Sequence, residues 1–251
     1  MKKLALFFVL AMAVGCTTDD TENVPQGMLA RKVVREFTGQ QYTTRYYYTG
    51  HKLERTESSN NTREFYYYDG DLIVNIKRYD DTNLEVESQF QYDATDRLVM
   101  RREINDDNTQ WRYDYTYNAD GTVTVTPHWT SADGVEYAHD PSQYFFENGE
   151  VSHITSTSAD GTFTVAYTYD DKLVPEHGIV GLDKIRMFEP DAYKGIYHNI
   201  VTVTQTSSVN SDVGTYTHLW TYNADGAPTF FMFDDAGTII IDGGSYQYFY
   251  K

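Results

Sequence analysis

The chain has 251 residues, with 20 basic and 37 acidic side chains, a net charge of −17, one cysteine, and 3 Trp, 23 Tyr and 13 Phe. The acidic balance excludes a generic nucleic-acid binder, which needs clustered lysine and arginine against the phosphate backbone. A single cysteine excludes an internal disulfide framework and a thiolate zinc site, and so many aromatic residues exclude a disordered chain.

The first 15 residues predict a signal peptide. Lys2 and Lys3 precede an unbroken apolar run of eleven residues, from Leu4 to Val14. A bilayer-spanning helix needs about 20 apolar residues, so this run is too short to span a membrane and is typical of a signal-peptide core. We therefore expect residues 1–15 to be a signal peptide and not part of the fold.

The residues around Cys16 indicate a lipid attachment site. The sequence Ala13-Val14-Gly15-Cys16 resembles the lipobox of bacterial lipoproteins, in which the cysteine becomes the lipidated first residue of the mature chain. The usual leucine three residues before the cysteine is replaced here by Ala13. The alternative is an ordinary signal peptide followed by an incidental cysteine. Lipidation of Cys16 is the prediction, because it also accounts for the only cysteine of the chain.

Residues 16–29 are predicted to form a flexible tether. The segment is polar and acidic, with Asp19, Asp20 and Glu22, and has too little apolar surface to fold. An acidic cluster directly after a lipidated cysteine resembles the surface-export signal of Bacteroidota lipoproteins, and a plain solvated linker on a periplasmic protein is the alternative. Loss of Lys2 and Lys3 takes the charge from −17 to −19. Acyl chains in the outer membrane are therefore the expected contact with lipid, and the cell surface is the expected location.

Residues 30–251 are predicted to form a single all-β domain made of repeated hairpins. In each copy, two aromatic residues separated by one residue precede an Asp/Asn/Gly turn, and an aliphatic residue follows. Tyr115-Thr116-Tyr117-Asn118-Ala119-Asp120-Gly121, followed by Val123, is a clear copy. Six successive copies, from Tyr48 to Tyr169, are 20 to 29 residues apart, which indicates a repeat architecture. The last aromatic residues of the eight copies are Tyr48, Tyr68, Tyr92, Tyr117, Phe146, Tyr169, Tyr222 and Phe233.

One copy predicts two antiparallel strands. Side chains alternate along a strand, so Tyr113, Tyr115 and Tyr117 share one face. Asn or Asp with Gly supplies the positive φ of a tight turn, and the β-branched run 122–126 forms the returning strand. Aromatic–aliphatic pairs across the two strands then stabilise the hairpin.

The regular spacing lapses between the copies that end at Tyr169 and Tyr222. This gap contains two strand patterns, at residues 200–204 and 216–220, so a degenerate hairpin is expected there. Glu176–Tyr197 carries neither the aromatic phrase nor an alternating pattern. We expect this stretch to be irregular or helical and to be inserted into the space that the strands enclose.

An up-and-down barrel of about sixteen antiparallel strands is the predicted fold, because closure removes the exposed edges of a long sheet. A strongly curved open sheet or a sandwich is the alternative. Embedding of the barrel in the outer membrane is disfavoured, because tyrosines run along whole strands and do not gather in two girdles. The opposite faces of the strands also carry charged residues, namely Lys77, Arg78, Arg101, Arg102 and Glu103.

The hairpin phrases carry a family resemblance. The Tyr-Asp and Asn-Ala-Asp-Gly turns with aromatic residues before them resemble YD, or RHS-like, repeats. Together with the lipobox and the acidic tether, they are similar to uncharacterised Bacteroidota lipoproteins with a porin-like fold, over residues 31–251. The resemblance implies a fold and an envelope location. It brings no catalytic residues with it.

A search for chemistry finds no phosphate-binding loop, zinc-protease motif or nucleophile elbow, so no cofactor and no catalytic residue is predicted. The seven histidines have no paired ligand spacing, and no metal site is predicted. Acidic turns such as Asn105–Asn108 lack the spacing of a calcium loop and are explained by turn formation. A glycan-processing hydrolase with two paired carboxylates remains the alternative function, and Asp114, Glu136 and Glu147 are no better candidates than other acids.

The tryptophans are the best candidates for ligand contacts. Trp111, Trp129 and Trp220, with the tyrosines, are candidates for stacking surfaces for a glycan or peptide ligand, although core packing or cross-strand pairing is the first explanation for most of the aromatic residues. Trp129 stands out because residues 127–131 are interpreted as a loop after a strand. The sequence thus predicts a non-catalytic, lipid-anchored binding or scaffold module of the cell envelope, with no nucleic-acid partner.

Overall fold

The structure, a computed structural model, describes residues 29–37, 39–188, 194–209, 214–235, 238–239 and 245–250. The predicted signal peptide, Cys16 and all of the tether except Leu29 lie outside these residues. The elements are β1 (Ala30–Phe37), β2 (Gln40–Thr49), β3 (Lys52–Ser58), β4 (Thr62–Asp69), β5 (Leu72–Asp80), β6 (Asn83–Tyr92), β7 (Leu98–Asn105), β8 (Gln110–Tyr117), β9 (Val123–Thr130), β10 (Glu136–Ala138), β11 (Ser142–Glu147), β12 (Glu150–Ser158), β13 (Gly161–Leu173), α1 (Leu182–Arg186), β14 (His198–Ser207), β15 (Gly214–Tyr222), β16 (Pro228–Asp235), β17 (Thr238–Ile239) and β18 (Ser245–Tyr250).

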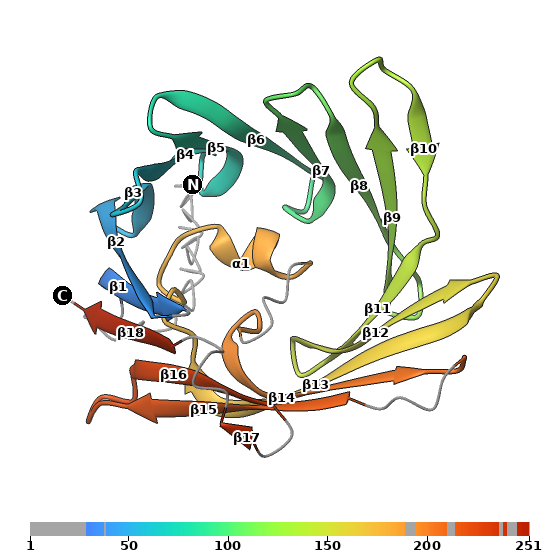
Figure 1. Ribbon diagram of the computed structural model, residues 1–251. Coiled ribbons are helices and arrows are strands. Elements are labelled where there is room, and N and C mark those ends of the chain that lie inside the picture. The colour runs from blue at the N-terminus through green and yellow to red at the C-terminus, as the bar shows by residue number, and fades with distance from the viewer. Residues whose placement is uncertain are drawn as a thin grey trace, which may run out of the picture.

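The strands form a closed antiparallel barrel of sixteen positions, as the hairpin repeat predicted. Most strands pair with the next strand along the chain. Near the C-terminus β16 pairs with β18, and β1 pairs with β18 to close the ring. The strands β10 and β11 both pair with β9 at different heights and together fill one position. Among the residues that the structure describes, the short β17 pairs with β16 alone, and it lies outside the ring. Figure 1 shows the ring and the segment that it encloses.

The turns follow the chemistry of the repeated phrase. In the β8–β9 turn, Gly121 has φ of 86° and its N–H donates to the Asn118 carbonyl at 3.1 Å. The Asp120 carboxylate accepts hydrogen bonds from the Thr122 amide at 3.0 Å and the Thr122 hydroxyl at 2.7 Å. A left-handed residue and a side-chain acceptor fix this tight turn, so the register of the following strand is set locally.

In four of the repeats, the last tyrosine ties its hairpin to the hairpin before it, and Tyr250 of β18 makes the same kind of bond. The hydroxyl donates to a backbone carbonyl 18 to 22 residues earlier, at the barrel end where no turn joins the two strands. Tyr68 instead accepts the Leu53 N–H, and Tyr222 donates to Asp170. Burial raises the pKa of Tyr117 to about 12, so its hydroxyl stays a donor at neutral pH. The pairs are Tyr48–Ala30 (2.8 Å), Tyr92–Ile73 (2.7 Å), Tyr117–Leu98 (3.1 Å), Tyr169–Val151 (2.6 Å) and Tyr250–Pro228 (2.6 Å).

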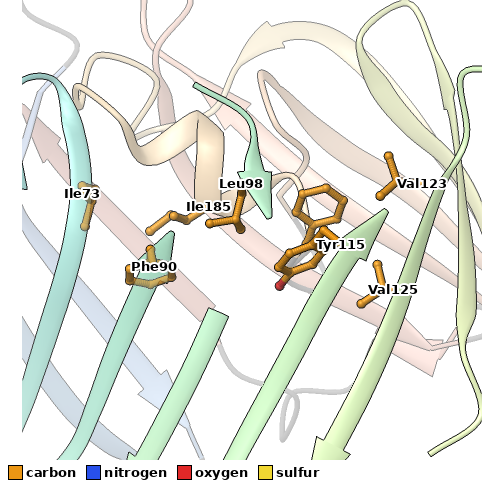
Figure 2. Close-up of a cluster of buried hydrophobic side chains, with 8 residues drawn as sticks. Ile73, Phe90, Leu98, Tyr115, Val123, Val125 and Ile185 are labelled. Atoms are coloured by element: carbon orange, nitrogen blue, oxygen red, sulfur yellow. The ribbon is translucent and has the colours of Figure 1, made fainter. Parts of the chain in front are cut away.

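The segment between β13 and β14 lies inside the barrel, as predicted for the stretch where the repeat lapses (Figure 1). It contains α1, which is too short and too polar to cross a membrane, and no helix in the described part of the chain is long and apolar enough to do so. Ile185 and Phe188 pack against the inward side chains of β5–β9. Figure 2 shows Ile185 directed toward Phe90 and Leu98 of the barrel wall. We call residues 174–188 and 194–197 the insert.

The insert defines the two faces of the wall. Side chains that pack against it, such as Tyr66, Phe90 and Tyr115, point inward, so the alternate residues of the same strands point outward. The outward positions of β12–β16 are largely threonines that pair across strands, for example Thr168 with Thr202 at 2.5 Å. This part of the wall is therefore polar outside, and the inner wall is aromatic and aliphatic where it packs on the insert. The inner wall also carries charge, because Arg101 and Glu103 pair with Tyr113 and Trp111 and share their inward face. The prediction that Arg101 and Glu103 lie on the face opposite the tyrosines was wrong.

Candidate functional site

The insert fills only part of the barrel and leaves a cavity of about 400 Å³ on one side. The walls of this cavity are β1–β4, β18 and the insert. Two other hollows border Arg63 near the β3–β4 and β5–β6 turns, and neither is lined by a buried charge. The lining residues of the cavity inside the barrel are Val33, Arg35, Thr44, Tyr46, Leu53, Thr56, Ser58, Thr62, Glu64, Tyr66, Glu176, Ile179, Leu182, Arg186, Lys194, Tyr246 and Tyr248. We call it the lumenal cavity.

Three buried charges of the insert face the lumenal cavity. The Glu176 carboxylate contacts Lys194 Nζ at 2.8 Å through Oε1 and Arg186 Nη2 at 3.3 Å through Oε2. The three side chains are only 5%, 9% and 10% exposed in the order Glu176, Lys194 and Arg186. Burial alone would raise the pKa of Glu176, but the two cations outweigh it and hold that pKa below its ordinary value. The group is therefore ionised at neutral pH and carries a net positive charge.

Tyrosines and hydroxyls form the opposite wall. Tyr66 donates its hydroxyl to Glu64 at 2.9 Å, and the Thr56 hydroxyl donates to the same carboxylate at 3.4 Å. Burial, with the nearby carboxylates of Glu176 and Glu64, raises the pKa of Tyr46 well above its ordinary value, and burial with Glu64 does the same for Tyr66. Both phenols stay protonated, so this wall offers aromatic faces and neutral hydroxyls beside one carboxylate.

A second buried glutamate anchors the C-terminal end of the insert. Glu150, at the start of β12, accepts the backbone N–H groups of Ile196 at 2.7 Å, Tyr197 at 2.9 Å and His198 at 2.7 Å. Gly195 leaves room for this contact, because a Cβ there would lie 2.6 Å from Glu150 Oε2 and 2.4 Å from the Tyr169 ring. The chain can therefore turn back from the lumen into β14 only with a glycine at this point.

The start of the insert docks on two of the hairpin turns. His51 and Gly178 are joined through the His51 ring at 3.1 Å, and the Val180 N–H donates to the His51 carbonyl at 3.1 Å. Gly181 has φ of 75°, and a Cβ there would lie 2.4 Å from the Asp71 carbonyl oxygen. The β2–β3 and β4–β5 turns thus hold the insert at one end of the barrel.

Two of the predicted ligand-contact tryptophans come together. Trp111 and Trp129 pair across β8 and β9, and Trp129 stacks on Tyr137 of β10 at 5.4 Å between ring centroids. His139 lies 5.1 Å from Trp111. Trp111 shares the inward face of Tyr115, so this group faces the lumen, away from the residues of the cavity just described. A ligand contact at these two tryptophans stays a prediction.

The expected loop at residues 127–131 was wrong, because Pro127–Thr130 continue β9. Proline lacks an N–H, which made the segment look like a loop. The Pro127 carbonyl accepts the His139 N–H at 2.9 Å, so the missing donor of Pro127 faces the gap between β10 and β11. The interruption lies between β10 and β11, and β9 itself continues through Pro127 as an unbroken strand.

Trp220 lies elsewhere, in a packed cluster with Phe231 and Tyr248, and its indole N–H donates to the Ile200 carbonyl at 3.0 Å. This packing accounts for Trp220, and a ligand contact there also stays a prediction. Cys16, the predicted lipid attachment site, lies outside the described residues.

The acids named from the sequence do not meet in the lumen. Asp114 and Glu136 face outward and contact Arg112 at 3.2 Å and 3.0 Å, while Glu147 is exposed at the end of β11. Asp107, in the acidic turn before β8, accepts the Thr109 amide at 2.9 Å. No group of three or more His, Cys, Asp or Glu suited to a metal ion occurs among the residues that the structure describes.

Sequence reasoning missed the charged group of the insert. Glu176, Arg186 and Lys194 carry no spacing motif, and their meeting depends on how the insert folds inside the ring. The available signal was the lapse of the repeat, which marked residues 176–197 as different without showing what they bring together. Glu150 is likewise 46 to 48 residues from the amides that it binds.

The comparisons with known proteins concern the fold. No family model matches the chain, and no curated protein is detectably similar to it in sequence. A porin-like protein from Bacteroides vulgatus has a similar structure, with a TM-score of 0.62 and 12% identity over 89% of this chain and 98% of that chain. A porin-like protein from Bacteroides uniformis has a TM-score of 0.53 and 14% identity over 88% of this chain and 96% of that chain. The chain therefore has a porin-like barrel fold, which agrees with the fold implied by the resemblance noted in its sequence.

Proposed function

We propose that this protein is a lipid-anchored module of the cell envelope that binds a small ligand in the lumenal cavity and catalyses no reaction. The observation that carries the proposal is the cavity itself, in which aromatic side chains, neutral hydroxyls and buried charges line one space inside the barrel. Its volume of about 400 Å³ lies in the range of small-molecule sites. A barrel that served only as a scaffold would be expected to fill its interior with apolar side chains.

A filled cavity tests the proposal. Thr44 lines the lumenal cavity from β2, and Thr43 beside it points outward. Thermal unfolding of the wild-type chain against panels of oligosaccharides and short peptides should reveal ligands that raise the melting temperature. Thr44→Trp should abolish the shift, and Thr43→Trp should leave it unchanged. The proposal is wrong if no compound shifts the wild type, or if the filled variant responds like the wild type.

The polar outer wall supports anchoring by lipid and not by the barrel. A lipid-facing band must be apolar, and Arg or Lys at the bilayer midplane costs about 2–4 kcal/mol each. The outward positions of β2–β5 carry Arg45, Arg55, Arg63 and Lys77. We propose that Cys16 provides the membrane contact and that the body faces the medium outside the cell.

Fractionation tests the anchor. Cys16→Ala should move the protein from the outer-membrane fraction to the soluble fraction, while Cys16-containing protein on intact cells should be open to added protease. Retention of Cys16→Ala in the membrane would instead indicate an embedded barrel. Protection of the wild type from protease would indicate a periplasmic location.

The hydrolase alternative has one observation in its favour, because Glu64 and Glu176 line the same cavity. A glycosidase pair needs a general acid whose pKa is raised. The pKa of Glu176 is lowered by Lys194 and Arg186, so this carboxylate is held ionised and is a poor proton donor. Turnover of a chromogenic glycoside that is lost in both Glu64→Gln and Glu176→Gln would favour the enzyme over the binding module.

A further inference from the structure

We infer that the lumenal cavity binds an acidic sugar, with Arg186 as the residue that holds the carboxylate of the ligand. This inference rests on the proposed binding function and narrows it to one class of ligand. Three features of the cavity carry it: an excess of positive charge, an arginine with unused donors, and an amphipathic wall.

The cavity is positive although the chain is strongly acidic. The charged side chains that the described residues contribute to its lining are Arg35, Arg186 and Lys194 against Glu64 and Glu176. This balance is opposite to the −17 of the whole chain. Both oxygens of Glu176 are already engaged by Lys194 and Arg186, and Glu64 accepts from Tyr66 and Thr56. The carboxylates of the cavity are therefore satisfied, whereas its cations are in excess.

Arg186 has donors left for a ligand. A guanidinium carries five N–H donors, and this one makes a single contact, at 3.3 Å, with Glu176. No other acceptor in the described ranges lies within hydrogen-bond distance of it, although its side chain is only 10% exposed. A guanidinium with several open donors in a partly desolvated cavity is suited to bind a carboxylate through two hydrogen bonds.

Arg35 supplies a second cation at the mouth of the cavity. Its guanidinium lies 5.4 Å from the Phe37 ring and 5.6 Å from the Tyr246 ring. Within the described part of the chain, no carboxylate approaches it within 4.0 Å. An exposed, unpaired cation at the entrance attracts anions toward the cavity and raises their association rate.

The rest of the wall fits a sugar ring better than an acyl chain. Tyr246 and Tyr248 line the cavity with nearly parallel rings, at 15° and 6.5 Å between centroids, and Tyr46 and Tyr66 line it from β2 and β4, so the wall has aromatic surface for the C–H side of a sugar. Thr56, Ser58 and the Glu64 carboxylate offer partners for its hydroxyls. These groups already bond within the wall, to Tyr66, to one another or to Thr44, but their oxygens have further acceptor capacity. Sugar hydroxyls can use that capacity, whereas an acyl chain cannot.

Isothermal titration of the full mature chain with galacturonate, galactose and acetate tests the inference. Galacturonate should bind, galactose should bind at least about tenfold more weakly, and acetate should not compete at equal concentration. Arg186→Gln should lower the affinity for galacturonate by about tenfold or more, since a hydrogen bond to a charged group is lost. Arg186→Lys should restore part of the affinity. Lys184→Gln is the matched control, because Lys184 lies on the same helix, pairs with Asp183 and does not line the cavity.

The outcomes separate the two proposals. Equal binding of galactose and galacturonate, both abolished by Thr44→Trp, would overturn the acidic-sugar assignment and leave the binding function standing. Equal binding of acetate and galacturonate would overturn the sugar part of the assignment. If neither sugar binds but a peptide does, the inference fails and the proposed function survives. If Arg186→Gln does not fold, two other measurements test for a cationic site. Raising the salt concentration should lower the affinity of the wild type for galacturonate about tenfold, and Arg35→Gln should bind galacturonate more slowly. The absence of both effects would overturn the inference.

Discussion

The two sides of the insert meet the barrel wall in different ways. Toward β5–β9, Ile185 and Phe188 pack into a continuous cluster with Phe90, Leu98 and Tyr115. Toward β1–β4 and β18, the insert makes a smaller apolar contact, of Ile179 with Leu29 and Leu53, and presents three charged side chains across a cavity. These are Glu176, Arg186 and Lys194. The first side is a core in the ordinary sense, since apolar surface is removed from water. The second side keeps open space beside buried charge.

This difference teaches how the barrel builds a site. The packed side fixes the position of the insert, so the charges on the other side are held in place without any ligand. Such preorganisation lowers the cost of binding. We therefore expect changes on the packed side to affect stability, and changes on the cavity side to affect binding and the dependence of stability on pH.

Phe188→Ala should have the largest effect on stability. Phe188 stacks on Tyr115 at 4.2 Å between ring centroids and meets Tyr144 edge-on at 5.7 Å. Removing a buried phenyl ring should lower the free energy of unfolding by about 4 kcal/mol, measured by urea denaturation. Phe163→Ala is the control, because Phe163 is 42% exposed and should cost less than about 1 kcal/mol. Similar losses in the two variants would contradict a packed side.

Glu176→Gln should come next, at about 3 kcal/mol, because it leaves two buried cations without their anion. The folded state lowers the pKa of Glu176, so its contribution is present above the ordinary value of 4.5 and is lost as pH falls below it. Unfolding measured between pH 7 and pH 3 should show this acid loss in the wild type and less of it in the variant. Glu36→Gln, at an exposed position of β1, should keep the wild-type slope. The absence of any difference between the two variants would refute the buried ion group.

The barrel was predictable because its signals are local. A phrase such as Tyr115–Gly121 contains the alternation, the turn residues and the returning strand within a few positions. The prediction of a loop failed at Pro127, because a residue without an N–H is compatible both with a loop and with a strand whose neighbouring ladder is interrupted. The hydrogen bonds from tyrosine hydroxyls to backbone carbonyls of the preceding hairpin recur with the hairpin repeat. The sequence predicts where these tyrosines lie, but the carbonyl that each hydroxyl contacts is known only from the folded barrel.

The site was not predictable for a different reason. Lys194 and Glu176 are 18 residues apart in a segment without periodicity, and Glu150 reaches amides 46 to 48 residues away. These contacts exist because the barrel encloses the insert, so no local pattern encodes them. The tryptophans were visible in the sequence, whereas the charges that make the cavity distinctive were hidden among many ordinary acids and bases.

Glu150→Gln should cost about 2 kcal/mol, since one amide oxygen replaces a carboxylate that accepts three backbone N–H groups. The loss should be confined to the end of the insert. Hydrogen exchange should therefore quicken at Ile196–His198 and stay unchanged at β5–β9. Glu147→Gln, in the same turn but exposed, should change neither, and uniform exchange across the barrel would show that Glu150 supports the whole fold and not the insert alone.

The smallest effects should come from two tyrosine hydroxyls, one on each side of the insert. Tyr92 packs on the β5–β9 side and donates to the Ile73 carbonyl at 2.7 Å, so Tyr92→Phe leaves a buried acceptor unpaired and should cost about 1 kcal/mol. Tyr66 lines the cavity and donates to Glu64 at 2.9 Å, where water can replace the lost hydroxyl, so Tyr66→Phe should cost less than half as much. Chemical denaturation of both variants compares them directly. Equal costs would mean that water does not reach Glu64, and the cavity would then be closed to a hydrophilic ligand.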